Sequence, residues 1–331
     1  MPMILLNKQD IQKIFNMKEA IEASKEAFRL YSEGRTVVPL RINVNVPKNE
    51  GQTLYMIAYA EDIDCGGVKI VSVFPKNIEK GIASVQACVV LVDEITGETI
   101  AMLDGTYLTQ LRTGAAQGAA TDILARKDAK IAVLFGAGGQ AAAQLEAMLT
   151  VRPLKYVYVF DANKERAREF ATIQQERLSS YGANIVACDE PNDVIPEADI
   201  ITTVTTSKKP VFKGSLVKCG AHINGVGAYT PQMQELDEDL IVRADRIYVD
   251  SKDAVLSEAG DLIIPINKGL ITKDKITGEL GEVIMGSVQG RERDDEITIF
   301  KTVGIAVQDI VTGYKIYQKA LKTDVGTKFE L

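Results

Sequence analysis

A glycine-rich segment in the middle of the chain has the residue types and spacing that a bound dinucleotide needs. Residues 136–141 read GAGGQA after the apolar run 131–135, and this fits the pattern GxGxxA. Gly136 permits a tight turn, and Gly138 lets a pyrophosphate approach the backbone. A helix is expected to follow, to about Leu149, and the N–H groups of its first turn attract negative charge to the same place.

An acidic residue follows at the spacing expected for a ribose contact. Asp161 ends the next apolar run, 157–160, and 161 − 136 = 25 positions separate it from the first glycine. A carboxylate there accepts hydrogen bonds from ribose hydroxyls and repels a 2′-phosphate, so we expect NAD as the cofactor. NADP stays possible because Lys164 and Arg166 are close in sequence. The alternative is an ordinary strand-to-helix turn in which Asp161 caps the next helix.

Further contacts to the cofactor are expected at the ends of later strands. Residues 202–206, at the end of the strand expected at 199–203, are in a usual place for such contacts, although they can also be a simple polar strand end. The residues predicted to bind the cofactor are Gly136, Ala137, Gly138, Gly139, Gln140, Asp161, Thr203, Val204, Thr205, Val226 and Gly227.

The second half of the chain has the pattern that would position this loop. From Lys130 onward, short apolar strands alternate with helical segments, which is typical of a parallel sheet covered on both faces. Strands are expected at 130–135, 156–161, 184–187, 199–203, 221–226 and 246–250, and the clearest helix at 164–181. These features predict an α/β, Rossmann-type doubly wound domain over residues 126–302.

The first third predicts a smaller α+β domain with a mostly antiparallel sheet. Asn16 and Glu19 can form a capping box for a helix that begins at Met17. A second helix is expected at 107–125, and the amphipathic stretch 303–321 should pack back on this sheet. The domain would therefore comprise residues 1–125 and 303–331. The β-like runs are 41–46, 53–59, 68–74, 83–92 and 99–103, with Thr96-Gly97 as the turn of a hairpin between the last two.

Composition excludes several classes of function. The chain has 331 residues with 38 Lys and Arg against 45 Asp and Glu, and a net charge of −7 argues against nucleic-acid binding. No apolar run approaches the roughly 18 residues of a membrane helix, and the start does not match a secretion signal, so we expect a cytoplasmic protein. Four dispersed cysteines and a single histidine, His222, offer no metal centre, and His222 is expected to be a core residue.

Several further motifs, in order along the chain, resemble those of the ornithine cyclodeaminase and mu-crystallin family. The resemblance covers nearly the whole chain. It implies a homodimer in which the N-terminal domain and the final helices form the substrate and dimer unit around a Rossmann domain. The motifs are Gly67-Val68-Lys69, Leu111-Arg112-Thr113-Gly114-Ala115, Gly136-Ala137-Gly138-Gly139-Gln140, Asn224-Gly225-Val226-Gly227-Ala228, Glu258-Ala259-Gly260-Asp261 and Phe300-Lys301-Thr302-Val303-Gly304.

The resemblance also implies which residues hold the substrate. Arg41, Lys69 and Arg112 match the positions that bind a substrate carboxylate in the family. The physical case agrees, because an anionic substrate needs a fixed cationic clamp and arginine offers planar, bidentate geometry. The alternative is that Arg41 and Lys69 are exposed charges on strands and that Arg112 lies on a helix surface.

Tyr229 marks a departure from the family pattern. Cyclodeaminases that convert ornithine to proline carry an aspartate at this position, and its carboxylate handles the substrate amino group. A phenol with a pKa of about 10 is a poor base at neutral pH, which argues against cyclodeamination. Tyr229 can instead hydrogen-bond an imine or amine, or form an aromatic wall. The candidate catalytic residues are Tyr229 and Lys69. Lys69 would act as a proton donor, a role that water could also fill.

Together with the nucleotide-binding pattern, the resemblance implies an NAD(P)-dependent oxidoreductase that acts on a small α-imino or α-keto acid, such as a ketimine or pyrroline-2-carboxylate reductase. The clamp would set the α-carbon over the nicotinamide, so that hydride transfer depends largely on positioning. Alternatives within the family are an ornithine cyclodeaminase, which forms proline and ammonia, and an alanine dehydrogenase. An alternative of another class is a non-catalytic protein that binds NADPH and a small ligand.

Overall fold

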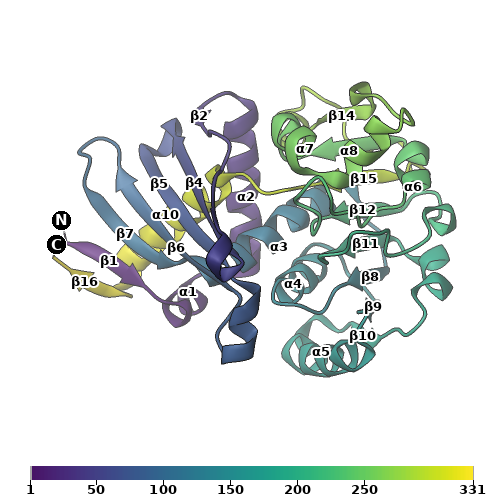
Figure 1. The fold of residues 1–331 in the computed structure, drawn as a ribbon, viewed down its shortest axis with the longest axis horizontal. Coiled ribbons are helices and arrows are strands. Elements are labelled where there is room, and N and C mark those ends of the chain that lie inside the picture. Colours follow the sequence, from purple (N-terminus) through teal and green to yellow (C-terminus); the bar gives the residue numbers. More distant parts are fainter. Residues whose placement is uncertain (1, 331) are drawn as a thin grey trace. The chain divides into compact units, whose positions relative to one another are not determined.

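The structure, a computed structural model, describes residues 2–330 and divides the chain into two compact units (Figure 1). The first unit contains residues 2–112 and 305–330, and the second contains residues 113–304. The first division lies inside helix α3 (Gly105–Leu124), which continues from one unit into the other. The sequence-based division at residue 125 instead assigned this whole helix to the first domain. The roles proposed for the two units stay a prediction.

The first unit is built on an eight-stranded, mostly antiparallel sheet. Its strands are β1 (Met3–Leu6), β2 (Thr36–Val37), β3 (Ile42–Val46), β4 (Gly51–Ala60), β5 (Cys65–Val73), β6 (Val85–Asp93), β7 (Thr99–Asp104) and β16 (Thr327–Phe329). The order is β16-β1-β7-β6-β5-β4-β2, and β3 also pairs with β4. The pair β1–β7 is parallel and the remaining pairs are antiparallel. The predicted α+β architecture is confirmed.

Two helices, α2 (Met17–Ser32) and α10 (Ala306–Thr323), contact each other, and α10 packs on β4, β5 and β6. The predicted capping box is present: the side chain of Asn16 accepts the N–H of Glu19 at 3.0 Å, and the reverse bond has the same length. Because α10 buries Ile310 and Ile316 against the first unit, the expectation that the final helix packs on this sheet is confirmed. A short helix, α1 (Lys8–Ile14), also contacts α10.

The other face of this sheet carries apolar side chains. Pairing places Ile57 opposite Val68, Val68 opposite Val90, and Val90 opposite Met102, so these four share one face. Ile57 and Met102 are exposed, and Val68 and Val90 are half-buried. We call these four residues the apolar sheet face. A row of this kind is more apolar than a solvated antiparallel strand face usually is.

The second unit contains an eight-stranded, fully parallel sheet in the order β10-β9-β8-β11-β12-β15-β13-β14. The strands are β8 (Ile131–Phe135), β9 (Tyr156–Phe160), β10 (Asn184–Ala187), β11 (Ile200–Thr203), β12 (His222–Gly225), β13 (Arg246–Val249), β14 (Ile276–Glu279) and β15 (Thr298–Lys301). The helices besides α3 are α4 (Ala141–Val151), α5 (Lys164–Arg177), α6 (Glu238–Arg243), α7 (Lys252–Glu258), α8 (Gly260–Asn267) and α9 (Leu280–Ile284). The predicted Rossmann-type architecture is confirmed.

The sequence-based interpretation missed β14 and β15. Both have only four residues, and β14 reads ITGE, in which glycine and glutamate hide the apolar pattern. Strand β15 begins directly after a charged stretch, 291–296, and has only one residue, Ile297, between that stretch and its first residue. In the sheet, β15 lies between β12 and β13, and β14 forms the edge next to β13.

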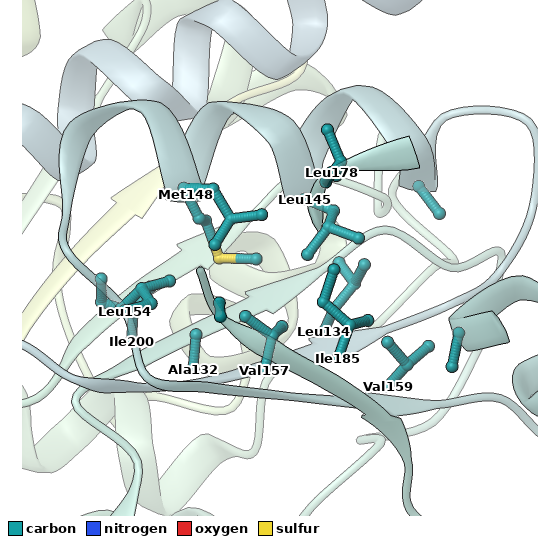
Figure 2. Packing of buried hydrophobic residues seen from close by; sticks show 14 of the residues in the cluster. Ala132, Leu134, Leu145, Met148, Leu154, Val157, Val159, Leu178, Ile185 and Ile200 are labelled. Carbon is teal, nitrogen blue, oxygen red and sulfur yellow. The ribbon is translucent and has the colours of Figure 1, made fainter. Parts of the chain in front are cut away.

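An apolar cluster fixes helix α4 on the parallel sheet (Figure 2). Leu134 of β8 and Val157 of β9 are fully buried in it, together with Leu145 and Met148 of α4. Because β8 and α4 are both anchored in this cluster, the glycine-rich loop between them is held at both ends.

No helix in the described part of the chain is long and apolar enough to cross a membrane.

Candidate active site

The glycine-rich loop forms the tight turn that its sequence predicts. Gly136 follows β8 directly and has φ of +102°, a conformation that favours glycine. A Cβ at this residue would lie 2.7 Å from the carbonyl oxygen of Val204. Any other residue at position 136 would therefore be strained and would collide with the loop that follows β11.

The start of α4 is suited to an anion. Gly138 and Gly139 are exposed, and a Cβ at Gly138 would meet no atom within 4 Å, so packing within the protein does not require glycine there. The residue before α4 is Gln140, and its side chain does not cap the N–H groups of the first turn. The pyrophosphate of a dinucleotide fits both features, since it needs close approach to the backbone and free N–H donors.

Asp161 follows β9 and points its carboxylate at the glycine loop. Its Oδ2 accepts the N–H of Ala137 at 2.8 Å, and its Oδ1 accepts from Asn163 at 2.8 Å and from Nη2 of Arg166 at 2.5 Å. Burial raises the pKa of Asp161, but these hydrogen bonds outweigh burial and hold its pKa below the usual range. The side chain of Asn163 caps α5, so the alternative in which Asp161 is the cap is wrong.

The loops after β11 and β12 lie at the same edge of the sheet as the glycine loop. The N–H groups of Val226 and Gly227 donate to the carbonyl of Thr203 at 2.9 and 3.2 Å. The strand order reverses between β8 and β11, which is where this class of sheet binds nucleotides. Within residues 2–330, the buried oxygens Thr203 Oγ1 and Gln140 Oε1 have no hydrogen-bond partner, as expected where a bound molecule completes the site.

A glutamate that the sequence analysis did not identify ties these two loops together. Glu235 is fully buried and accepts three backbone N–H bonds: from Thr205 at 2.6 Å, from Gly227 at 2.7 Å and from Ala228 at 2.8 Å. Two of the three donors belong to residues predicted to contact the cofactor. The carboxylate therefore fixes the spacing of the two loops.

Two further buried charges support Glu235. Oδ1 of Asp261 accepts the N–H of Glu235 at 2.7 Å, and Oδ2 of Asp261 lies 2.9 Å from Nζ of Lys301 in an ion pair that lacks hydrogen-bond geometry. Burial first, and the charge of Asp261 second, raise the pKa of Glu235, while Lys301 opposes the shift. The motifs at 258–261 and 300–304 thus belong to the support of the nucleotide-binding edge.

In the first unit, two of the predicted carboxylate-binding residues share one carboxylate of the protein. Lys69 of β5 and Arg112 of α3 are both buried. Asp309 of α10 accepts from Nζ of Lys69 at 2.6 Å through Oδ2, and from Nε of Arg112 at 3.0 Å through Oδ1. Oε1 of the neighbouring Gln308 accepts from Nη1 of Arg112 at 3.1 Å. The alternative of exposed surface charges is therefore wrong for Lys69 and Arg112.

Lys69 has an unusual protonation equilibrium for a lysine. Burial first, and the positive charge of Arg112 second, lower its pKa to about 7, although Asp309 favours the ammonium form. Arg41, which is half-buried just before β3, lies close enough for its charge to contribute to the same lowering. The structure therefore brings Arg41, Lys69 and Arg112 into one electrostatic cluster.

The remaining candidates lie in the second unit. Tyr229 is half-buried in the loop after β12, two residues beyond Gly227.

His222 is fully buried, with Nδ1 at 2.9 Å from Oγ1 of Thr298 and Nε2 at 3.0 Å from Oδ1 of Asn224. Burial first, and the charge of Arg291 second, lower its pKa to about 3. This is the core histidine that was expected. Among the described residues, no group of three or more His, Cys, Asp and Glu side chains forms a metal site.

The position of Asp309 in the sequence indicates that it is a buried carboxylate. It lies three positions after Ala306 and four before Gly313, and hence on the buried stripe of α10. A carboxylate on such a stripe needs a cationic partner. Glu235 left no comparable signal, because it lies in an irregular loop without a periodic pattern.

Known proteins resemble this chain over its full length. A Δ1-pyrroline-2-carboxylate reductase of Bacillus cereus is 40% identical over 99% of this chain and 100% of its own length. The solved structure of the Thermococcus litoralis Δ1-pyrroline-2-carboxylate reductase, in complex with NADH and L-proline, is 41% identical and has a TM-score of 0.93 over 98% of this chain and 100% of its own. An archaeal alanine dehydrogenase, solved as a dimer with bound NAD, is 35% identical and has a TM-score of 0.90 over 100% of both chains.

The family to which these similarities point is the one that the motifs resemble. The family model for ornithine cyclodeaminase and mu-crystallin matches residues 2–324. That range includes both the glycine loop and the Lys69–Arg112–Asp309 cluster. This chain therefore belongs to the ornithine cyclodeaminase/mu-crystallin family.

Proposed function

We propose that this protein reduces Δ1-pyrroline-2-carboxylate, or a cyclic imino acid of similar size, to the corresponding amino acid with NADH. The observation that carries the proposal is the buried pair of Lys69 and Arg112, because two cations in a dry environment are suited to one small carboxylate. The named reductases that are about 40% identical over the full chain support this substrate class.

The protein is an NAD(P)-dependent oxidoreductase of its family. Its nucleotide-binding edge would hold the cofactor through the loop 136–140, the carboxylate of Asp161 and the loops that Glu235 spaces. When bound there, NADH supplies a hydride for the imine carbon. The ionised carboxylate of Asp161 favours NADH, and Arg166 beside it leaves room for NADPH.

The substrate carboxylate would contact Arg112, Lys69 and Arg41. Fixing this group sets the imine carbon in one position and removes much of the entropy cost of the reaction. Reduction adds a hydride to carbon and a proton to nitrogen, so each turnover consumes one NADH and one proton. Lys69, with a pKa of about 7, is suited to donate that proton near neutral pH, and water is the alternative donor.

Tyr229 argues for reduction over cyclodeamination. Its phenol is a weak base at neutral pH, so it cannot do the work that an aspartate does at this position in ornithine cyclodeaminases. It would instead form a wall or hydrogen-bond the substrate nitrogen.

Spectrophotometric NADH oxidation tests the proposal. We expect stoichiometric oxidation with Δ1-pyrroline-2-carboxylate, and slower oxidation with pyruvate plus ammonia, the reaction of an alanine dehydrogenase. Ammonia release from ornithine without net NADH change would instead identify a cyclodeaminase. NADH binding without turnover of any of these substrates would identify a non-catalytic binding protein.

The proposal includes a homodimer that forms through the apolar sheet face. Exposed Ile57 and Met102 would be covered by a second copy, and the alanine dehydrogenase of similar structure is a dimer. A cytoplasmic location is the remaining part of the proposal, and it rests on the sequence analysis.

A further inference from the structure

The carboxylate of Asp309 occupies the centre of the cationic cluster. Asp309 is fully buried, and each of its two oxygens binds a different cation, Lys69 through Oδ2 and Arg112 through Oδ1. Gln308 holds a second nitrogen of the same guanidinium, and its own Oε1 is held by the N–H of Ile305 at 3.3 Å. Two of the three guanidinium nitrogens of Arg112 are thus fixed by the first turn of α10.

Charge balance explains why a carboxylate is needed there. Lys69 and Arg112 carry two positive charges when Lys69 is protonated, and Asp309 carries one negative charge, so 2 − 1 = +1 remains on these three residues. Without Asp309, the repulsion between the buried cations would be uncompensated, and repulsion of this kind is strong in a medium of low dielectric constant. With Asp309, the cluster keeps enough positive charge to attract an anionic substrate.

We propose that Asp309 is a positioning residue for the reduction: it holds the Lys69 ammonium and the Arg112 guanidinium in one arrangement, so that both face the substrate carboxylate. The inference rests on the proposed function and deepens it. Asp309 itself acts through the two cations and need not touch the substrate.

The surroundings of Lys69 show which charges control its protonation. Arg112 approaches from α3 and Arg41 from the segment before β3, and both disfavour the ammonium form; Asp309 of α10 favours it. The cross-strand neighbours of Lys69 are Met56 and Val89, which are apolar and buried. Removal of the Asp309 charge therefore lowers the pKa of Lys69 further.

The variant Asp309→Asn tests this inference because it keeps the shape and removes the charge. The ratio of variant to native kcat/KM for Δ1-pyrroline-2-carboxylate is measured against pH, since titration of the substrate cancels in this ratio. If the pKa of Lys69 falls by about one unit, the ratio falls about tenfold near pH 8 and recovers to within about twofold near pH 5. A purely structural defect would lower the ratio equally at all pH values.

A matched control removes another carboxylate that faces α10. Glu26 of α2 pairs at 2.9 Å with Lys315 of α10, six positions beyond Asp309, and this pair is partly exposed, so Glu26→Gln should leave the pH profile unchanged. A second variant, Asp309→Glu, keeps the charge and displaces it by one methylene. It should raise KM at least about fivefold while the pH dependence of kcat/KM stays native. If Asp309→Asn does not fold, this variant tests the inference in its place.

The outcomes separate the inference from the proposed function. A native pH profile for Asp309→Asn, or an unchanged KM for Asp309→Glu in an enzyme that reduces the imine, would overturn the inference and leave the proposed function intact. Failure of the native protein to reduce any imino acid would overturn both.

Discussion

Replacement of Glu235 by glutamine should loosen the nucleotide-binding edge. The native carboxylate accepts three backbone N–H bonds of 2.6 to 2.8 Å, one on Oε1 and two on Oε2. An amide has one acceptor oxygen, so Glu235→Gln keeps at most the two bonds from Gly227 and Ala228 and turns an NH₂ group toward the N–H of Thr205. A hydrogen bond to a charged group contributes about 1.5–3 kcal/mol, and we expect a loss of about 2–4 kcal/mol in the free energy of unfolding.

The same change should weaken cofactor binding more than it slows turnover. Thr205 and Gly227 are predicted cofactor contacts, and their loops lose their common acceptor. Urea unfolding monitored by circular dichroism gives the stability, and NADH fluorescence titration gives the dissociation constant, which should rise at least about tenfold. Glu238→Gln is a suitable control, because Glu238 lies in the same segment but pairs with Lys268 at the surface.

Native stability and native NADH affinity in Glu235→Gln would refute this reasoning. Such a result would mean that Glu235 is already protonated in the folded protein, since a neutral carboxyl group and an amide would then be nearly equivalent. Burial and Asp261 do raise its pKa. We expect the ionised form nevertheless, because three N–H donors and the ammonium of Lys301 face the region of this carboxylate.

Four further substitutions test other parts of the structure. Arg112→Ala should raise KM for the imino acid about tenfold to a hundredfold in steady-state kinetics, because charged hydrogen bonds to the substrate carboxylate are lost. An unchanged KM would show that Arg112 does not bind the substrate. Asp161→Ser removes a negative charge and should raise kcat/KM with NADPH relative to NADH, whereas Arg166→Ala removes a positive charge and should lower this ratio. Parallel changes with both cofactors would contradict this. Ile57→Lys should convert a dimer to a monomer in light scattering with little change in melting temperature, because Ile57 is 42% exposed; a persistent dimer would place the interface elsewhere.

The features that could be predicted from the sequence are those with a local cause. The capping box of Asn16 and Glu19 needs only four residues, and the glycine loop needs only a strand before it and a helix after it. The convergence of Arg41, Lys69 and Arg112 followed from family resemblance, because nothing local indicates it. Short strands such as β14 were missed because their side chains carry no apolar alternation.

The partners of Asp309 show why the remaining contacts could not be predicted. Its partner Lys69 is 240 positions away, and the contact exists only because α10 returns to the first sheet after the entire second unit has been completed. The amphipathic pattern of α10 predicted that return, but the pattern does not specify which strand residue lies opposite Asp309. Packing register decides this, and it depends on side-chain shapes along the whole interface.

The scarcity of histidine in this chain gives the buried lysine a particular importance. His222 is the one histidine of the sequence, and its pKa of about 3 keeps it neutral throughout the neutral range, so it cannot donate a proton to a substrate there. Lys69 has a pKa of about 7 and is protonated below that value. Burial and two arginines thus give a lysine the protonation range that an unperturbed histidine usually supplies, and Asp309 limits how far the shift goes. On this argument the high-pH limb of kcat/KM belongs to Lys69, and the charge of Asp309 sets its position.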